Sequence, residues 1–317
     1  DSVIIWRRDG AKTGTFERRF QRALRTDGPT EIIVFWRPFN QELAVTTLAS
    51  RRVEEAAKHR LTTDDFHPEV LKLFDRYVHG LIDRRGFLEG AGKYAAVGTT
   101  AVGLLEALSP KYAEVQQVAK DDKRIKAEYA EYQSPQGYGK MRGYLVRPAN
   151  ASGKLPGIVV VHENRGLNPH TEDVARRAAL ENFVAFAPDA LTPLGGYPGT
   201  DEAGVEMQRK LEQPKIQEDF LAAVHWLRAH QATTGRVGIV GFCFGGGISN
   251  AMAVRVPELG AAVPFYGGQP RAEDVPKINA PLMLHYAEMD ERINAGWPAY
   301  EAALKANNKR YTVHIYP

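Results

Sequence analysis

The feature that most constrains the fold is a glycine-rich turn around the only cysteine of the chain, within residues 237–247. β-Branched residues predict a strand that ends just before Cys243, and Gly-x-Cys-x-Gly-Gly predicts the start of a helix. Such a turn forces its middle residue into a strained backbone conformation, which the small neighbours Gly241, Gly245 and Gly246 must tolerate. It also places Cys243 at a helix N-terminus, where the dipole and N–H groups favour a thiolate and an oxyanion. We therefore interpret Cys243 as a nucleophile; the alternative is a packed cysteine without chemistry.

The sequence around this turn alternates between strand and helix patterns from about residue 125 onward. Several strand candidates are continuous apolar runs, which is typical of a parallel sheet covered by helices on both faces. The predicted strands are 141–147, 157–162, 183–187, 237–240, 261–265, 282–286 and 311–316. The predicted helices are 171–182, 201–211, 216–229, 246–256 and 298–307. We therefore predict an α/β domain with a mostly parallel sheet over residues 121–317.

A second motif, His-Glu-Asn-Arg-Gly at residues 162–166, follows another predicted strand. In an α/β-hydrolase fold, one oxyanion-hole N–H comes from the loop after this strand, and the other from the residue after the nucleophile. We expect these donors to be the backbone N–H groups of Asn164 and Phe244. Glu163 is a candidate partner for a thiol or for a polar substrate group. Zinc is not indicated because His162 lacks a second histidine at the required helical spacing, and we predict neither a metal nor a cofactor.

A third motif lies at residues 282–293, where a buried strand delivers acidic residues into a loop. The chain order of this fold is nucleophile, then acid, then histidine, and it places the acid here. Asp290 is the better candidate, and Glu288 and Glu291 are interpreted as its solvated neighbours. The role of Asp290 would be to orient an imidazole and to stabilise its charged form.

The same chain order places the catalytic histidine after the last predicted strand, beyond Pro317. None of the nine histidines lies there. His314 lies within that strand and is interpreted as a sheet residue, whereas His162 and His285 are interpreted as satisfied histidines beneath the site. We therefore expect the 317-residue chain to lack its base and to be nearly inactive, because the loss of one triad member costs several orders of magnitude in rate.

Together these motifs resemble the dienelactone hydrolase family, over residues about 61–317. The resemblance implies a Cys-His-Asp triad that acts on esters or lactones, with Cys243 as the nucleophile and Asp290 as the acid. It also implies that Glu163 holds the resting cysteine and helps to activate it when substrate binds. The segments that carry the resemblance are His-Glu-Asn-Arg-Gly-Leu-Asn-Pro at 162–169, Gly-Gly-Tyr-Pro-Gly at 195–199, Gly-Phe-Cys-Phe-Gly-Gly at 241–246 and Glu-Met-Asp-Glu-Arg-Ile-Asn at 288–294.

One departure from the family concerns the substrate. In the dienelactone enzymes, an arginine shortly after the Pro-Asp of the fourth strand helps to bind the substrate carboxylate. Here Pro188 and Asp189 are followed by Ala-Leu-Thr at 190–192. The dienelactone itself is therefore not indicated over another small carboxylic ester or lactone. The alternative from a different functional class is a non-catalytic protein with this fold that serves as a binding or scaffold module.

The N-terminal part carries weaker signals. Residues 1–60 are basic with short apolar runs, and we predict a poorly ordered extension. Residues 61–120 are predicted to be a helical leader in which Arg84 and Arg85 precede Phe-Leu and a mildly apolar stretch, a pattern that resembles a twin-arginine export signal. The alternative is an amphipathic helix that packs on the main domain. The chain begins with Asp1 and stops within a strand, so we interpret it as a fragment at both ends.

Charge and hydrophobicity limit the classes of partner that the sequence indicates. The net charge of +3 is small for 317 residues and does not indicate nucleic acid. No run of about 18 apolar residues predicts a membrane-spanning helix. The predicted partners are a small ester or lactone and, through Arg84 and Arg85, an export machinery. The predicted location is therefore either the cytoplasm or, if the twin-arginine-like segment is used, the periplasm or the outside of the cell.

Overall fold

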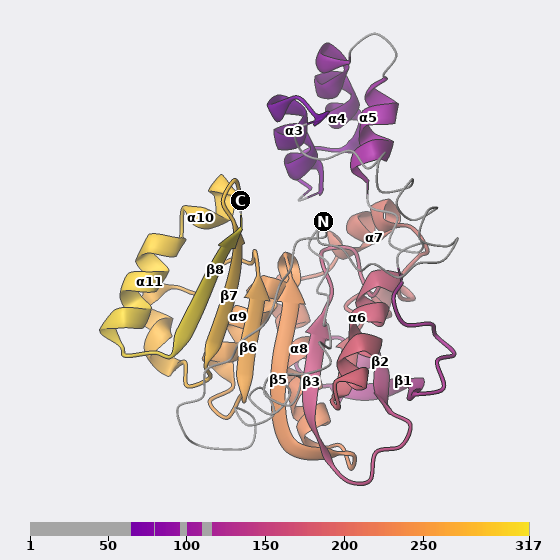
Figure 1. Ribbon diagram of the computed structural model, residues 1–317, viewed down its shortest axis with the longest axis vertical. Helices are drawn as coiled ribbons and strands as arrows, with labels where there is room; N and C mark the ends of the chain where they lie inside the picture. Colours follow the sequence, from indigo (N-terminus) through magenta and orange to yellow (C-terminus); the bar gives the residue numbers. More distant parts are fainter. Residues whose placement is uncertain (1–64, 79, 96–99, 110–115, 317) are drawn as a thin grey trace, which may run out of the picture. The chain divides into compact units, whose positions relative to one another are not determined.

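The computed structural model describes residues 65–78, 80–95, 100–109 and 116–316 (Figure 1). These residues belong to two compact units, one within residues 65–109 and the other within 116–316. The predicted extension at residues 1–60 lies outside the described residues. Nowhere in the described ranges does a helix have both the length and the apolar character that crossing a membrane requires.

The first unit is helical, with α3 (Pro68–Val78), α4 (Arg84–Ala91), the 3₁₀ turn η2 (Gly92–Tyr94) and α5 (Ala101–Leu108). The side chain of Asp83 accepts the Gly86 N–H at 2.7 Å and so caps α4, whose first two residues are Arg84 and Arg85. Arg85 pairs with Glu89 at 2.8 Å on the exposed side of the helix. The interpretation of the two arginines as an export signal stays a prediction. The buried core of this unit consists of Val70, Phe87, Ala91 and Leu105.

The second unit is built on one eight-stranded sheet with the strand order β1-β2-β4-β3-β5-β6-β7-β8. The pairs β1/β2 and β2/β4 are antiparallel, and all other neighbours are parallel. All seven predicted strands are present, and one further strand, β1, was missed. Most of its exposed side chains are charged or polar, so it lacks a continuous apolar run. The strands are β1 (Ile125–Ser134), β2 (Gly139–Pro148), β3 (Leu155–Val161), β4 (Val184–Pro188), β5 (Thr233–Phe242), β6 (Ala261–Phe265), β7 (Leu282–Ala287) and β8 (Tyr311–Tyr316).

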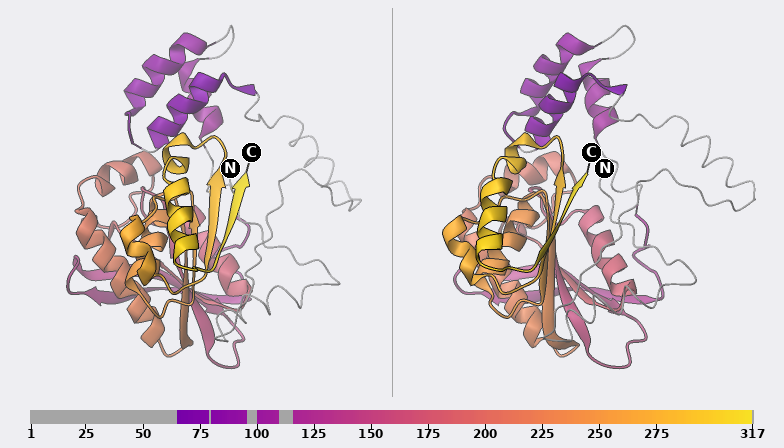
Figure 2. Two further views of the ribbon diagram at one scale, coloured as in Figure 1. Left: turned by 90° about the vertical axis from the view of Figure 1, so that its left-hand side faces the viewer. Right: turned by 60° about the vertical axis from the view of Figure 1, so that its left-hand side comes forward.

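Helices cover both faces of this sheet, which confirms the predicted architecture. Helix α6 packs on one face, whereas α8, α9 and α11 pack on the other (Figure 2). The five predicted helices are present. The helical leader predicted over residues 61–120 does not extend into residues 116–120, which form no helix. The helices are α6 (Pro169–Leu180), α7 (Asp201–Gln208), α8 (Gln213–Ala229), α9 (Phe244–Arg255), α10 (Glu291–Asn294) and α11 (Trp297–Ala306), with the 3₁₀ turns η3 (Thr192–Leu194) and η4 (Ala272–Lys277).

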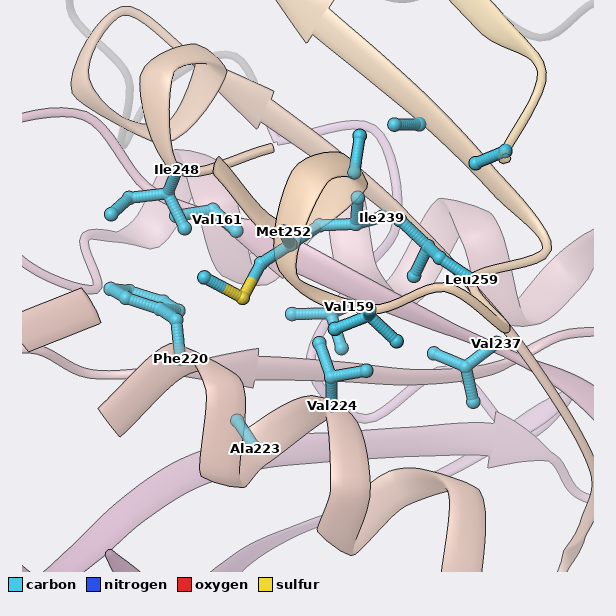
Figure 3. Close-up of a cluster of buried hydrophobic side chains, with 14 of the residues drawn as sticks. Val159, Val161, Phe220, Ala223, Val224, Val237, Ile239, Ile248, Met252 and Leu259 are labelled. Atoms are coloured by element: carbon cyan, nitrogen blue, oxygen red, sulfur yellow. The ribbon is translucent and has the colours of Figure 1, made fainter. Parts of the chain in front are cut away.

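The main hydrophobic core lies between the central strands and the helix pair α8/α9. Alternate residues of β3 and β5 face this layer, and they pack against side chains of both helices (Figure 3). Burial of such side chains stabilises a fold by about 1.5–3 kcal/mol each. The core therefore holds the β5–α9 turn, which contains the cysteine, in a fixed frame. Central members of the core are Val159, Val161, Val237, Ile239, Phe220, Val224, Ile248 and Met252.

Candidate active site

Cys243 lies between the end of β5 and the start of α9 with φ 53° and ψ −111°. A non-glycine residue in this region of backbone space costs on the order of 1–3 kcal/mol and persists only when its surroundings enforce it. The Cys243 N–H donates to the Phe265 carbonyl at 3.0 Å, and its own carbonyl accepts from the Gly247 N–H at 3.1 Å. The neighbouring strand β6 and helix α9 therefore hold the strained residue from both sides. Its side chain is half-buried.

The glycines around the cysteine differ in what a side chain would meet. A Cβ atom on Gly241, Gly245 or Gly246 would lie 2.1, 2.5 or 2.4 Å from a backbone oxygen. These oxygens belong to the turn itself, to the end of β3 and to the end of β6, and none of them can move freely. At Gly247 the nearest atom would lie 3.6 Å away, which is an ordinary contact. The first three glycines are therefore required by close backbone approach, and the fourth is not.

The parallel strands bring the predicted residues to one edge of the sheet. Glu163 comes two residues after β3, Cys243 one residue after β5, and Asp290 three residues after β7. Because β3, β5, β6 and β7 are adjacent and parallel, their carboxyl ends meet at the same edge. This edge is where open α/β sheets bind their ligands. Tyr266, which follows β6 directly, joins them there.

The carboxylate of Glu163 is held on both oxygens. Tyr266 donates its hydroxyl to Oε1 at 3.2 Å, and Arg165 Nη2 lies 3.1 Å from Oε2. Arg165 also donates from Nη1 to Asp201 Oδ2 at 3.1 Å. The sequence interpretation missed Tyr266 and Asp201. A sequence signal for Tyr266 was available, because two glycines follow it at a predicted strand end. In the structure its φ of 38° is also strained.

The predicted oxyanion donors lie on two segments that contact each other. Phe244 is the first residue of α9, so its N–H precedes the intrahelical hydrogen bonds. Asn164 lies in a tight turn in which the Arg165 N–H donates to the Glu163 carbonyl at 2.8 Å. A Cβ atom on Gly245 would meet the carbonyl oxygens of Val161 and His162. The first turn of α9 therefore lies directly against the backbone that leads into this loop.

Asp290 caps the short helix α10. Its Oδ1 accepts the Ile293 N–H at 3.1 Å, and its side chain is largely buried. The Glu288 N–H donates to the Tyr316 carbonyl at 2.7 Å, so this loop lies against the end of β8. Glu288 and Glu291 are exposed, as the sequence indicated. The carboxylate of Asp290 is thus held by the first turn of α10.

His162 is a structural histidine, as predicted. It is fully buried, its Nε2 accepts the Ala190 N–H at 3.1 Å, and its Nδ1 contacts the Glu163 carbonyl oxygen. Burial lowers the pKa of His162, so its ring is neutral at pH 7. A neutral ring that accepts at Nε2 carries its proton on Nδ1 and donates it to Glu163. The loop at residues 162–168, between β3 and α6, is called the site loop. His162 therefore connects the start of the site loop to the residues after β4.

His285 and His314 belong to the sheet. The His285 ring stacks on Phe265 at 4.0 Å between centroids and on His314 at 5.2 Å. Burial, with a smaller contribution from His314, lowers the pKa of His285 to about 3. Its Nδ1 lies 2.9 Å from the Tyr316 hydroxyl, whereas its buried Nε2 has no hydrogen-bond partner among the described residues. His285 is therefore only half satisfied, in contrast to the prediction.

The segment after β4 has no arginine and is occupied by packing residues. Ala190 and Leu191 are buried. The carboxylate of Asp189, itself buried, accepts the N–H groups of Leu167, Leu191 and Tyr197 at 3.2, 3.0 and 3.1 Å. Asp189 thereby organises the loops around the site. Within the part of the chain that the structure describes, no cluster of three histidine, cysteine or acidic side chains could hold a metal ion.

Two family models match the chain. The model of the dienelactone hydrolase family matches residues 141–317, which is more than half of the chain. A second model, described as YqhI-like, matches residues 57–96. The first match contains the strained cysteine and the acidic loop after β7, and most of the second falls in the helical unit.

Individual proteins agree with the first match. The provisionally named hydrolase fragment YghX of Escherichia coli (strain K12) is 55% identical over 113 residues, which are 36% of this chain and 97% of that protein. A Bradyrhizobium sequence named as a probable 2-oxo-3-(5-oxofuran-2-ylidene)propanoate lactonase is 30% identical over 187 residues, covering 55% of this chain and 75% of its own length. Among solved structures, a provisionally named dienelactone hydrolase of Klebsiella pneumoniae subsp. pneumoniae shares 29% identity and a TM-score of 0.52, over 61% of this chain and 86% of that one. The chain therefore belongs to the dienelactone hydrolase family.

Proposed function

We propose that the chain hydrolyses a small carboxylic ester or lactone, with Cys243 as nucleophile and Asp290 as the acid of a Cys-His-Asp triad. The observation that carries the proposal is the backbone of Cys243, which is held at φ 53° on a strand-to-helix turn whose residues 241, 245 and 246 have no room for a Cβ atom. Strain of this kind is maintained where a fold must present one side chain to a reacting atom. A cysteine that served only for packing would not require it.

In the proposed reaction, the Cys243 thiolate attacks the carbonyl carbon, and a carbon–sulfur bond forms while the π electrons move onto the carbonyl oxygen. The N–H groups of Asn164 and Phe244 stabilise this oxyanion. Collapse of the intermediate breaks the ester carbon–oxygen bond, and the leaving alkoxide takes a proton from the triad imidazolium. Water, deprotonated by the imidazole, then releases the acid from the thioester and regenerates the thiolate. At rest Glu163 holds the Cys243 thiol. When substrate binds, Glu163 helps the thiol proton to pass to the imidazole, which gives the thiolate and the imidazolium.

The base in this proposal is a histidine that follows β8. The hydrogen bond from Glu288 to Tyr316 supports this location, because it places the end of β8 beside the loop that carries Asp290. Among the described residues, no histidine is hydrogen-bonded to Cys243 or Asp290, and His162 uses its ring for backbone contacts. Loss of that histidine is then expected to slow the reaction by at least about 10³-fold.

The substrate class follows from the family and from the segment after β4. The family relative named as a lactonase supports a lactone or a related ester. Where the dienelactone enzymes have an arginine for the substrate carboxylate, this chain has the buried apolar residues Ala190 and Leu191. We therefore propose small esters and lactones in general, without a requirement for the carboxylate of a dienelactone.

The test is hydrolysis of p-nitrophenyl acetate and dihydrocoumarin by the complete protein and by its Cys243→Ala variant. The proposal predicts a loss of at least about 10⁴-fold in kcat/KM, because a nucleophile acts as a unit with its base. Iodoacetamide should label Cys243 and abolish the same activity. Equal hydrolysis by the variant would refute the proposal. Absence of hydrolysis by the unmodified complete protein, with Cys243 unreactive, would favour a non-catalytic binding module.

A further inference from the structure

A continuous path of polar contacts leads from helix α7 to Glu163. Asp201, the first residue of α7, accepts from Arg165 at 3.1 Å, and Arg165 Nη2 lies 3.1 Å from the Glu163 carboxylate. The side chains of Glu163 and Arg165 are only 15% and 11% exposed, and that of Asp201 is 26% exposed. Partial burial makes such charge-assisted contacts stronger than ordinary surface pairs. The path therefore couples α7 to the site loop.

Asp201 is itself fixed by further contacts. Its Oδ1 accepts the Tyr197 hydroxyl at 2.8 Å and lies 3.4 Å from Asn168 Nδ2. Burial, and then the Asp201 carboxylate, raise the pKa of Tyr197, so this hydroxyl keeps its proton and donates. The Asp201 carboxylate thus has one oxygen for Arg165 and the other for Tyr197 and Asn168. It can orient the guanidinium without moving itself.

The backbone of α7 also touches the site loop. A Cβ atom on Gly204 would lie 2.1 Å from the Arg165 carbonyl oxygen, so the helix approaches this peptide as closely as a glycine allows. Residues 162–168 form no helix or strand. Loops are more mobile than helices and strands, so groups outside the loop are needed to fix it. Helix α7 supplies such groups both to the backbone and to the side chain of Arg165.

We propose that Arg165 and Asp201 are positioning residues for Glu163, so that α7 sets the geometry of the site loop. The proposal rests on the proposed function, since it assigns roles around the same carboxylate. Arg165 holds Oε2 while Tyr266 holds Oε1, and this fixes both the position and the tilt of the carboxylate. Misplacement of a catalytic group by about 1 Å costs on the order of 10²-fold in rate. A purely structural ion pair would instead change stability and leave the rate of the folded enzyme unchanged.

The experiment measures kcat and KM of p-nitrophenyl acetate hydrolysis for the complete protein carrying Arg165→Met, Asp201→Asn or Glu163→Gln, and for the double variant Arg165→Met/Glu163→Gln. Positioning predicts that Arg165→Met and Asp201→Asn lower kcat by about 10- to 100-fold, with KM changed by less than about 3-fold. It also predicts that Arg165→Met has almost no further effect once Glu163 is replaced, because the two residues act through one carboxylate. Arg165→Lys should recover part of kcat, since it keeps a charge but not the two-sided geometry.

Glu206→Gln is the matched control. It breaks an ion pair with Arg209, the residue that follows α7, and both of these side chains are exposed. We expect a change in kcat below about 2-fold, as for an ordinary surface pair. Thermal unfolding of every variant separates loss of folded protein from loss of rate. If Arg165→Met and Glu163→Gln are additive, or if the variants change only the melting temperature, the positioning role is wrong.

The same data separate this inference from the proposed function. If Cys243→Ala retains full hydrolysis, the nucleophile is wrong and the positioning role fails with it. If Cys243→Ala abolishes hydrolysis while Asp201→Asn matches the control variant, the proposed function stands and only the role of α7 is overturned.

Discussion

A Cβ atom on Gly245 would lie 2.5 Å from the carbonyl oxygen of Val161. The first turn of α9 therefore touches the end of β3 with no side chain between them. This contact joins the segment that carries Cys243 to the segment that leads into Glu163. It fixes the separation of the two segments by backbone contact, which varies much less than contact through side chains.

Replacement of Gly245 by alanine should therefore be far more damaging than replacement of Gly247. In Gly245→Ala the methyl group overlaps backbone oxygens that cannot move, and overpacking of this kind costs about 1–3 kcal/mol or more. In Gly247→Ala the nearest atom is 3.6 Å away, and a helical glycine-to-alanine change can stabilise by up to about 1 kcal/mol. Urea unfolding of the two variants checks this difference. Equal destabilisation would contradict the assignment of Gly245 to a close backbone contact.

Gly204→Ala should loosen the site loop without touching the sheet. The added Cβ atom would lie 2.1 Å from the Arg165 carbonyl oxygen, so either α7 or the loop must shift. Because the shift displaces Glu163, we expect kcat/KM to fall by about 10-fold or more. Glu206→Ala, at an exposed position of the same helix, should retain nearly all activity. Unchanged kinetics in folded Gly204→Ala would show that α7 and the loop move independently.

His285 makes stability depend on pH. Its pKa is about 3 in the folded protein against an ordinary value of 6.5, so the unfolded chain binds the proton first as pH falls. The stabilisation is fully present above pH 6.5 and is lost as pH falls toward 3, by about 2 kcal/mol between pH 7 and pH 5.

The check is to compare the wild type with His285→Phe by urea unfolding at both pH values. The phenyl ring keeps the stack on Phe265 but cannot titrate, so the pH dependence should shrink by about that amount. His225→Gln, at an exposed position of α8, serves as the control. An unchanged difference between pH 7 and pH 5 in His285→Phe would exclude His285 as a source of the acid sensitivity.

Asp189→Ala should destabilise the loops around the site. The buried carboxylate accepts three backbone N–H groups, and its removal leaves them without these acceptors in a buried environment. The expected cost is about 3 kcal/mol or more, because each buried unsatisfied donor costs about 1–3 kcal/mol. Asp189→Asn keeps one acceptor oxygen, so its stability should lie between that of the wild type and that of Asp189→Ala. Hydrogen exchange of the Leu167, Leu191 and Tyr197 amides measures the effect, and unchanged protection would contradict it.

Much of the fold could be predicted because its signals are local. The apolar runs of β3, β5, β6 and β7 are long enough to mark buried parallel strands without knowledge of their partners. The strand β1 was missed for the opposite reason, since its charged residues point outward and its pairing with β2 is decided only in the sheet. The helical unit was recognisable from apolar spacing, whereas its core around Phe87 depends on packing between helices.

The sequence by itself determined the cysteine turn, because a glycine-flanked residue between a β-branched strand and a helix has few backbone solutions. It also indicated Glu163 and Asp290 through their places after strands, since parallel strands bring their carboxyl ends to one edge. Only the tertiary structure decided that Tyr266, Arg165 and Asp201 support Glu163. Tyr266 and Asp201 come from segments that are distant in the chain from Glu163 and Arg165, and no local pattern encodes which polar side chains meet there. The glycines that flank Cys243 in the sequence thus predict its strained backbone. The contacts that hold the Glu163 carboxylate arise from tertiary packing.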